Sequence, residues 1–228
     1  QDIFGHQRFR RMSSCCTPGG ASCGTNAFFS RWSRFYARRF LSGGLEPVQK
    51  HLLAGIGQEL VPGSKVLDIG CGVGSLHLTL LQRGAARAVG IDISEGMLNE
   101  AKRFAEQMGL NDRAEYINGD FTAVSATVSE SDITVLDKVV CCYENLDALI
   151  RLSAAKTKSM YALTHPKENM LMRSLFKSHR ALARIFGWSF HPFWHDWEKM
   201  KALILAQGFR LVDNRSTLAW QVLVFRRV

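Results

Sequence analysis

A glycine-rich stretch at residues 66–74 constrains the fold of this chain more than any other feature. It reads Val-Leu-Asp-Ile-Gly-Cys-Gly-Val-Gly, and a leucine-rich segment with a helical pattern begins at Ser75. Alternate glycines allow a sharp turn between a buried strand and a helix. They also let a ligand lie against bare main chain under the positive end of that helix. The stretch therefore predicts an α/β fold with a nucleotide-type site at its first strand–helix turn.

The spacing of the glycines separates two kinds of nucleotide site. A dinucleotide fingerprint requires glycine or alanine at position 75, but this chain has Ser75 there and its third glycine at Gly74. The carboxylate of Asp68 would repel a pyrophosphate and attract an amino or sulfonium cation. The alternative to a ligand site is a strand–turn–helix in which the glycines serve packing only.

This motif resembles the first motif of class I S-adenosylmethionine-dependent methyltransferases. The resemblance implies that the turn holds the methionine end of the cofactor, through Asp68, Gly70, Cys71, Gly72 and Gly74.

Two further carboxylates follow predicted strands. Residues 88–93 have the pattern of a buried parallel strand, and Asp92 near its end can accept hydrogen bonds from a ribose diol. Residues 114–118 predict the next strand, closed by Gly-Asp-Phe at 119–121. This tripeptide resembles the family's adenine site, which implies roles for Asp120 and Phe121. The resemblance adds four more residues to the expected cofactor site: Tyr36, Ile93, Met97 and Asp137.

The remaining periodicity predicts four more strands, at 133–136, 160–163, 209–216 and 220–225. Helices are expected at 27–40, 46–60, 75–83, 95–108, 146–156, 167–186 and 197–207. The closing strand pair resembles the reversed seventh strand of class I methyltransferases. We therefore expect a Rossmann-like three-layer sandwich with a seven-stranded, mostly parallel sheet and a reversed last strand.

The expected domain organisation has three parts. Residues 1–26 have loop composition and predict a flexible tail, and residues 27–62 predict a helical N-terminal cap rich in aromatic side chains. Residues 63–228 form the cofactor-binding domain, with a helical insertion near 167–195.

Composition limits the classes of partner. The net charge of +9 favours anionic partners, and no apolar run approaches the ~18 residues that span a bilayer. The six cysteines follow no hydrophobic signal peptide, so we expect reduced thiols in the cytoplasm and no metal site. They are Cys15, Cys16, Cys23, Cys71, Cys141 and Cys142.

The residues after strands four and five are the candidates for catalysis. His165 is the candidate base, Tyr143 would orient the acceptor, and Lys138 or Asp137 would contact cofactor or substrate. A His-Pro loop residue satisfied by backbone is the alternative reading of His165. A small-molecule acceptor is expected because the chain has no Asp-Pro-Pro-aromatic motif after strand four and no proline before Cys141.

Three hypotheses of function follow. The first is a small-molecule methyltransferase, since residues 29–36, the glycine motif and the strand plan resemble magnesium-protoporphyrin O-methyltransferases. The vicinal cysteines also suggest a thiophilic metalloid as acceptor. The second is an RNA methyltransferase, motivated by the positive charge, and the third is a non-catalytic cofactor-binding module.

Overall fold

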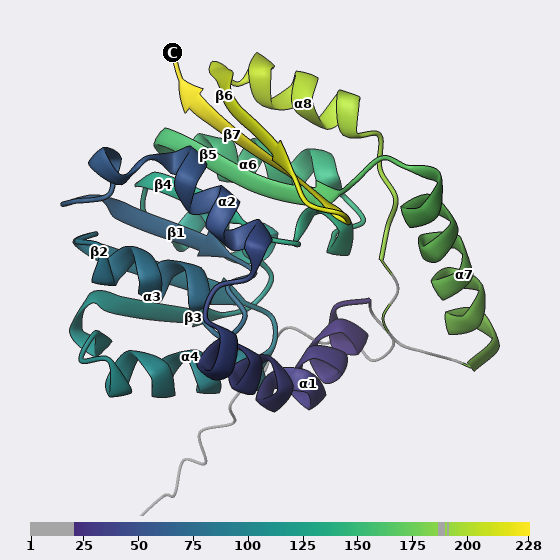
Figure 1. Cartoon of the computed structure of the whole chain (residues 1–228), viewed down its shortest axis with the longest axis horizontal. Coiled ribbons are helices and arrows are strands. Elements are labelled where there is room, and N and C mark those ends of the chain that lie inside the picture. Colours follow the sequence, from purple (N-terminus) through teal and green to yellow (C-terminus); the bar gives the residue numbers. More distant parts are fainter. Residues whose placement is uncertain (1–20, 187–189, 191) are drawn as a thin grey trace, which may run out of the picture.

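The computed structural model describes residues 21–186, 190 and 192–228 (Figure 1). A seven-stranded sheet runs through it in the order β3-β2-β1-β4-β5-β7-β6. The strands are β1 (Lys65–Ile69), β2 (Arg87–Asp92), β3 (Ala114–Asn118), β4 (Ser131–Leu136), β5 (Thr157–Pro166), β6 (Phe209–Ser216) and β7 (Trp220–Arg227). Only β7 is antiparallel to its neighbours, β5 and β6. The predicted sheet with its reversed last strand is confirmed.

Helices cover both faces of the sheet (Figure 1). The α-helices are α1 (Ala21–Gly43), α2 (Pro47–Ile56), α3 (Ser75–Gln82), α4 (Glu95–Gln107), α5 (Phe121–Val124), α6 (Leu146–Ala155), α7 (Met170–Phe186) and α8 (Trp197–Ala206). Within the described residues there are also four 3₁₀ turns: η1 (Gln58–Leu60), η2 (Asn111–Arg113), η3 (Ser125–Thr127) and η4 (Val140–Cys142).

Alternation along the strands builds one core on each face. Val66 of β1 packs with side chains of α2, α3 and α4, whereas the next residue, Leu67, packs with those of α6 and α8. Successive side chains of a strand point to opposite faces, so a strand buried on both faces reads as a continuous apolar run. This is why β1 and β4 were recognisable in the sequence, and it gives the three expected layers.

Capping side chains fix three of the predicted helix starts. Ser94 accepts a hydrogen bond from the amide of Met97, Asn145 from Ala148 and Asp196 from Lys199. Each cap satisfies a backbone donor that the first helical turn leaves open.

Several boundaries differ from expectation. Helix α1 begins at Ala21, so residues 21–26 are helical, while residues 1–20, with Cys15 and Cys16, lie outside the described residues. The helix expected at 46–60 is interrupted at Gly57, where φ is 86°. Helix α7 begins at Met170, three residues after the expected start.

Strand β5 is longer than predicted, with a consequence for the site. It runs to Pro166 because β7 continues the ladder, pairing His165 with Gln221 and Pro166 with Trp220. Residues 164–166 are therefore strand rather than the loop that the sequence suggested.

In the part of the chain that the structure describes, each helix is too short or too polar to cross a membrane.

Candidate functional site

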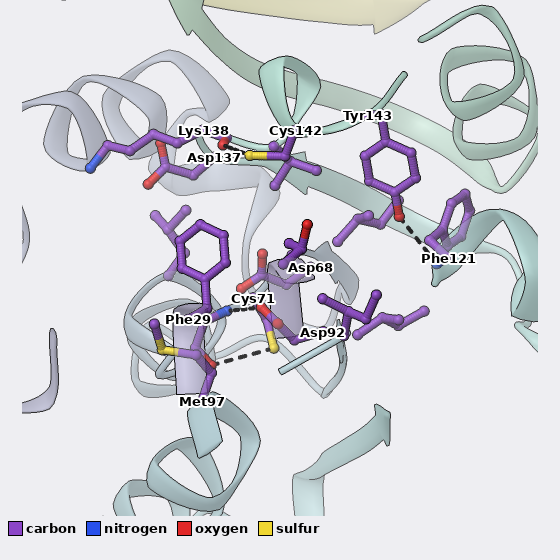
Figure 2. Close-up of a pocket in the computed structure, with 18 of the residues that line it drawn as sticks. Phe29, Asp68, Cys71, Asp92, Met97, Phe121, Asp137, Lys138, Cys142 and Tyr143 are labelled. Carbon is purple, nitrogen blue, oxygen red and sulfur yellow. Dashed lines mark hydrogen bonds between the residues drawn. The ribbon is translucent and has the colours of Figure 1, made fainter. Parts of the chain in front are cut away.

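A cavity of about 440 Å³ opens at the carboxyl ends of β1, β2 and β4 and is also lined by residues of helix α1. In open α/β sheets the ligand crevice lies where the strand order reverses, here between β1 and β4. Thirteen of the predicted site residues line it: Tyr36, Asp68, Gly70, Cys71, Gly72, Asp92, Ile93, Met97, Asp120, Phe121, Asp137, Lys138 and Tyr143. Figure 2 shows Asp68 and Asp92 facing the same space from neighbouring strands. Gly74 and His165 do not line the cavity.

The glycine turn leaves open space at one position and packs tightly at another. Gly72 has φ 53°, and a Cβ added there would meet nothing within 4 Å. Gly70 has φ 67°, and a Cβ there would overlap Cγ2 of Val139. Gly74, at φ 85°, is instead the N-terminal cap residue of α3. The chain therefore presents bare backbone to the cavity at Gly72, while Gly70 allows the turn to pack under Val139.

Asp92 connects the glycine turn to the end of β2. Its two carboxylate oxygens accept hydrogen bonds from the amides of Gly72 and Ser94, each at 2.8 Å. Burial raises the pKa of Asp92 to about 6, although these two amides oppose the shift and nearby Asp68 adds to it. A carboxylate held in this way can still accept hydrogen bonds from hydroxyl groups through its remaining lone pairs.

Asp68 is held by His77, which is buried, and His77 in turn contacts Tyr116, which is partly buried; the sequence analysis missed both residues. Nδ1 of His77 lies 2.8 Å from Oδ2 of Asp68, and Nε2 lies 3.1 Å from the hydroxyl of Tyr116. His77 stands in the leucine-rich sequence of α3, and its position in the first turn of the helix, just after the glycine turn, was its only signal.

Asp120 and Tyr143 form the wall nearest to β3. Oδ1 of Asp120 accepts hydrogen bonds from the amide of Thr122 at 2.8 Å and from the hydroxyl of Tyr143 at 3.0 Å. The same hydroxyl accepts from the amide of Phe121 at 3.2 Å. Burial and the adjacent Asp120 raise the pKa of Tyr143, so its hydroxyl keeps its proton. Figure 2 shows Tyr143 and Phe121 side by side at this wall.

Asp137, at the end of β4, is held by residues far away in the sequence. Gln49 of α2 donates to Oδ2 at 3.0 Å and the hydroxyl of Thr164 donates to Oδ1 at 2.8 Å. Burial raises the pKa of Asp137, and Lys138 beside it opposes that shift. Gln49 is a site residue that the sequence analysis missed. Its signal was the Glu-Pro-Val-Gln start of α2, where the Gln49 side chain accepts from the amide of Glu46 at 3.0 Å.

A charged cluster lies at the end of the cavity near α2. Nζ of Lys138 is 2.7 Å from Oε2 of Glu46, and the guanidinium of Arg39 is 3.4 Å from the same oxygen. The ammonium also lies 5.7 Å from the ring centre of Trp220. Lys138 has φ 61°, the only positive φ of a non-glycine residue in the described chain. Residues held in this sparsely populated region concentrate at functional sites.

Helix α1 covers the cavity with aromatic side chains. Phe29 and Tyr36 line it, and the hydroxyl of Ser30 lies 2.9 Å from that of Ser94 at the start of α4. A Cβ on Gly96 would come within 2.8 Å of the backbone of Ser30, so the glycine permits the close approach of α1 to α4. The predicted helical cap thus reaches the cavity through its own side chains.

His165 lies away from the cavity. Its side chain lies on the face of the sheet that α8 covers. There its ring stacks on Trp197 of α8 with ring centres 4.7 Å apart, and Nδ1 lies 2.9 Å from the carbonyl oxygen of Pro166. Burial lowers its pKa to about 4. The expected base is therefore a core residue satisfied by backbone, since the longer β5 turns this side chain away.

Two free thiols face the cavity. Cys71 and Cys142 line it, whereas Cys141 is buried outside it. Burial raises the pKa of the Cys71 thiol, and the neighbouring Cys141 together with burial raises that of Cys142. Both thiols are therefore protonated near neutral pH, which makes them weak nucleophiles and metal ligands.

Parts of the chain are similar in sequence to known methyltransferases. Residues 66–166 match the family described as a methyltransferase domain. The chain is 30% identical over 145 residues to the magnesium-protoporphyrin O-methyltransferase of Synechocystis, which covers 58% of this chain and 56% of that protein. It is 33% identical over 103 residues to a sterol 24-C-methyltransferase of Gibberella zeae, which covers 42% of this chain and 27% of that protein. The chain thus spans between 27% and 56% of the length of these two relatives.

Solved structures share the whole architecture. Magnesium protoporphyrin IX methyltransferase from Synechocystis, with bound SAH, has a TM-score of 0.66 at 22% identity and covers 90% of this chain and 98% of its own. The cyclase SpnF has a TM-score of 0.64 at 14% identity, covering 92% of this chain and 98% of its own. At these identities the similarity establishes the fold.

Proposed function

Because residues 66–166 belong to the methyltransferase domain family and the fold is that of class I S-adenosylmethionine-dependent methyltransferases, we propose that the chain transfers a methyl group from S-adenosylmethionine to a small-molecule acceptor. The resemblance predicted from the glycine motif is confirmed at the level of family and fold. Cofactor, acceptor and residue roles are the proposal.

One observation carries the proposal. Asp68, Asp92 and Asp120, at the ends of three adjacent parallel strands, line one cavity together with the bare backbone of Gly72. A cavity of about 440 Å³ is of the size that ligand sites have. Three carboxylates suit a ligand with an ammonium, a diol and an exocyclic amine, and they would repel a pyrophosphate.

Each carboxylate has a separate role in this proposal. Asp68 accepts from the amino group of the methionine part, Asp92 accepts from the ribose hydroxyls, and Asp120 accepts from the adenine amine. Met97 and Phe121 supply apolar walls for the ring, since both line the cavity and are otherwise buried. S-adenosylmethionine, when bound, supplies an electrophilic methyl group on a sulfonium.

The acceptor occupies the end of the cavity near Lys138, Tyr36 and Tyr143 in this proposal. The residues that line the described cavity include no histidine, and Tyr143 keeps its proton. Alignment of the acceptor with the methyl group is therefore the main contribution of the protein to the rate. In this proposal His165 takes no part in the reaction, because its ring stacks on Trp197 outside the cavity.

A small acceptor fits this site better than RNA. The cavity is covered by α1 and its charged cluster combines two cations with Glu46, whereas a nucleic-acid surface is a continuous basic groove. The relatives named for a porphyrin and a sterol support the same class of acceptor. The fold is also shared with a protein named as a cyclase, so methyl transfer itself must be measured.

The test is calorimetry followed by labelling. We expect heat of binding with S-adenosylmethionine and S-adenosylhomocysteine and none with a nicotinamide dinucleotide. Labelled methyl groups should then pass to a component of the small-molecule fraction of a cell extract. Asp92→Ala should abolish both signals, whereas Asp112→Ala, which removes an exposed carboxylate on η2, should retain them. Binding of the dinucleotide alone, or labelling confined to the RNA fraction, would contradict the proposal.

A further inference from the structure

Helix α7 exposes a strip of large apolar side chains. Leu171, Leu175 and Leu182 are 61%, 53% and 42% exposed, and their spacing of four and seven residues puts them on one side of the helix. Met170 and Ile185, near the two ends of the helix, are exposed as well. Soluble monomers rarely expose a contiguous apolar surface of this kind without a partner for it.

A different side of α7 holds the helix against the rest of the protein. The ring of Phe176 packs edge-on against Trp194 with centres 5.2 Å apart, and Ala183 is buried. Phe176 and Ala183 lie seven residues apart and so share one side. Figure 1 shows α7 (green) at the margin of the molecule, outside the helices that cover the sheet. The leucine strip therefore does not contribute to the packing of α7 against the rest of the protein.

A basic row runs along the side of α7 opposite the leucine strip, because each of its members is two positions from a leucine. Arg173, Lys177 and Arg180 are spaced four and three residues apart, and the helix sequence contains no acidic residue. Arg173 pairs with Glu168 at 3.4 Å and lies 5.7 Å from the ring centre of Trp194. Lys177 and Arg180 are exposed.

We propose that α7 docks the protein on an anionic lipid membrane, with its leucine strip in the headgroup region and its basic row against lipid phosphates. An amphipathic helix with a basic polar face and exposed leucines is the kind that lies in the plane of a membrane interface. The positive charge of the helix complements an anionic surface, and each lysine or arginine near such a surface strengthens binding.

The same features disfavour two other occupants. A second copy of the chain would bring two helices with four basic residues and no acid together, with repulsion between the rows. RNA would engage the basic row but would leave the exposed leucines in water.

Aromatic residues that come after α7 in the sequence lie at α1 and at the cavity. Later in the sequence than α7, the ring of Phe190 stacks on Phe28 of α1 with ring centres 5.1 Å apart, and Phe193 lines the cavity. Phe28 and Trp32 of α1 are themselves 37% and 46% exposed. The docking proposal does not depend on methyl transfer.

Vesicle flotation tests the docking proposal. The full chain should float with vesicles of phosphatidylcholine and phosphatidylglycerol, bind less to phosphatidylcholine alone, and be released by high salt. The triple variant Arg173→Gln, Lys177→Gln, Arg180→Gln should bind anionic vesicles on the order of 100-fold more weakly, at about fivefold per basic residue. The variant Leu171→Ser, Leu175→Ser, Leu182→Ser should lose binding to both kinds of vesicle.

Matched variants separate docking from general charge and from folding. Arg83→Gln, Lys102→Gln, Arg151→Gln removes the same charge from exposed sites elsewhere, and Leu218→Ser removes an exposed leucine from the β6–β7 turn. Both should bind vesicles as the unaltered chain does. Absence of flotation with anionic vesicles would overturn the proposal. So would a dimer, seen by light scattering, that the leucine variant dissociates, or RNA binding that the basic variant loses and the leucine variant keeps.

Discussion

His77 donates a hydrogen bond from Nδ1 to Oδ2 of Asp68 across 2.8 Å, and both side chains are buried under the glycine turn. Because a carboxylate can only accept, the proton lies on Nδ1. The other ring nitrogen, Nε2, lies 3.1 Å from the hydroxyl of Tyr116 on β3. The position of the first strand-end carboxylate is therefore fixed by a side chain of α3 and, behind it, by β3.

We predict that His77→Ala destabilises the protein and weakens cofactor binding together. Removal of a buried ring leaves a cavity and an unpaired carboxylate oxygen, which together lower the free energy of unfolding by about 3 kcal/mol. If Asp68 holds the cofactor amine, its looser position should raise the dissociation constant of S-adenosylmethionine roughly tenfold. Urea denaturation and calorimetry measure the two effects.

Tyr116→Phe is the matched control for His77→Ala. It removes the hydroxyl beside Nε2 but keeps the bond between His77 and Asp68, so it should cost only about 1 kcal/mol of stability and leave affinity unchanged. Equal loss of affinity in the two variants would show that His77 does not act through Asp68.

We predict that alanine at Gly72 mainly weakens cofactor binding, whereas alanine at Gly70 mainly lowers the stability of the protein. Gly72→Ala should cost about 1 kcal/mol for its positive φ and weaken cofactor binding at least tenfold, because its Cβ fills open cavity space. Gly70→Ala should cost roughly 3 kcal/mol or more, because its Cβ also collides with Val139. Thermal unfolding and calorimetry on both variants test this contrast, and unchanged affinity in Gly72→Ala would place the ligand elsewhere.

We predict that cofactor affinity rises with pH as Asp92 ionises. The folded pKa of about 6 lies above the ordinary value of 3.8, so the stabilising contribution of Asp92 is greatest below about pH 4 and is lost as the pH rises through 6. A ribose diol needs the ionised carboxylate, so ligand binding has the opposite dependence. The dissociation constant should fall about tenfold between about pH 5 and pH 7, with a midpoint near 6.

Asp120→Asn provides the comparison for the pH dependence. It should weaken binding but keep the midpoint near 6, whereas Asp92→Asn should remove the midpoint. A midpoint that persists in Asp92→Asn would assign the titration to another group.

The sequence predicted the strand-end carboxylates because their signals are local. Asp68 and Asp92 lie in the last two residues of their strands and Asp120 lies two residues after its strand, each within a few residues of a glycine. The parallel sheet brings such strand ends together wherever the helices between them lie. The same locality explains why helix starts with a capping Ser94 or Asn145 were found.

What the sequence could not predict depends on contacts between distant segments. The end of β5 is set by β7, more than fifty residues later, so the direction of His165 could not be read from its own neighbourhood. Gln49 reaches Asp137 across 88 residues of sequence, and only the packing of α2 on the sheet brings them together. The positive φ of Lys138 likewise could not be predicted, because lysine rarely adopts this backbone conformation.

We predict that the left-handed backbone conformation of Lys138, at the proposed acceptor end of the cavity, lowers the stability of the protein. Lys138→Gly relieves the left-handed strain, whereas Lys138→Ala keeps it, and both remove the ammonium that pairs with Glu46. The glycine variant should therefore be more stable than the alanine variant by about 1 kcal/mol in urea denaturation. If the ammonium contacts the acceptor, both variants should show the same several-fold rise in KM for the acceptor with unchanged affinity for S-adenosylmethionine. Equal stability of the two variants would argue against strain at this residue. An unchanged KM in both would remove Lys138 from the proposed acceptor site and leave the proposed cofactor site unaffected.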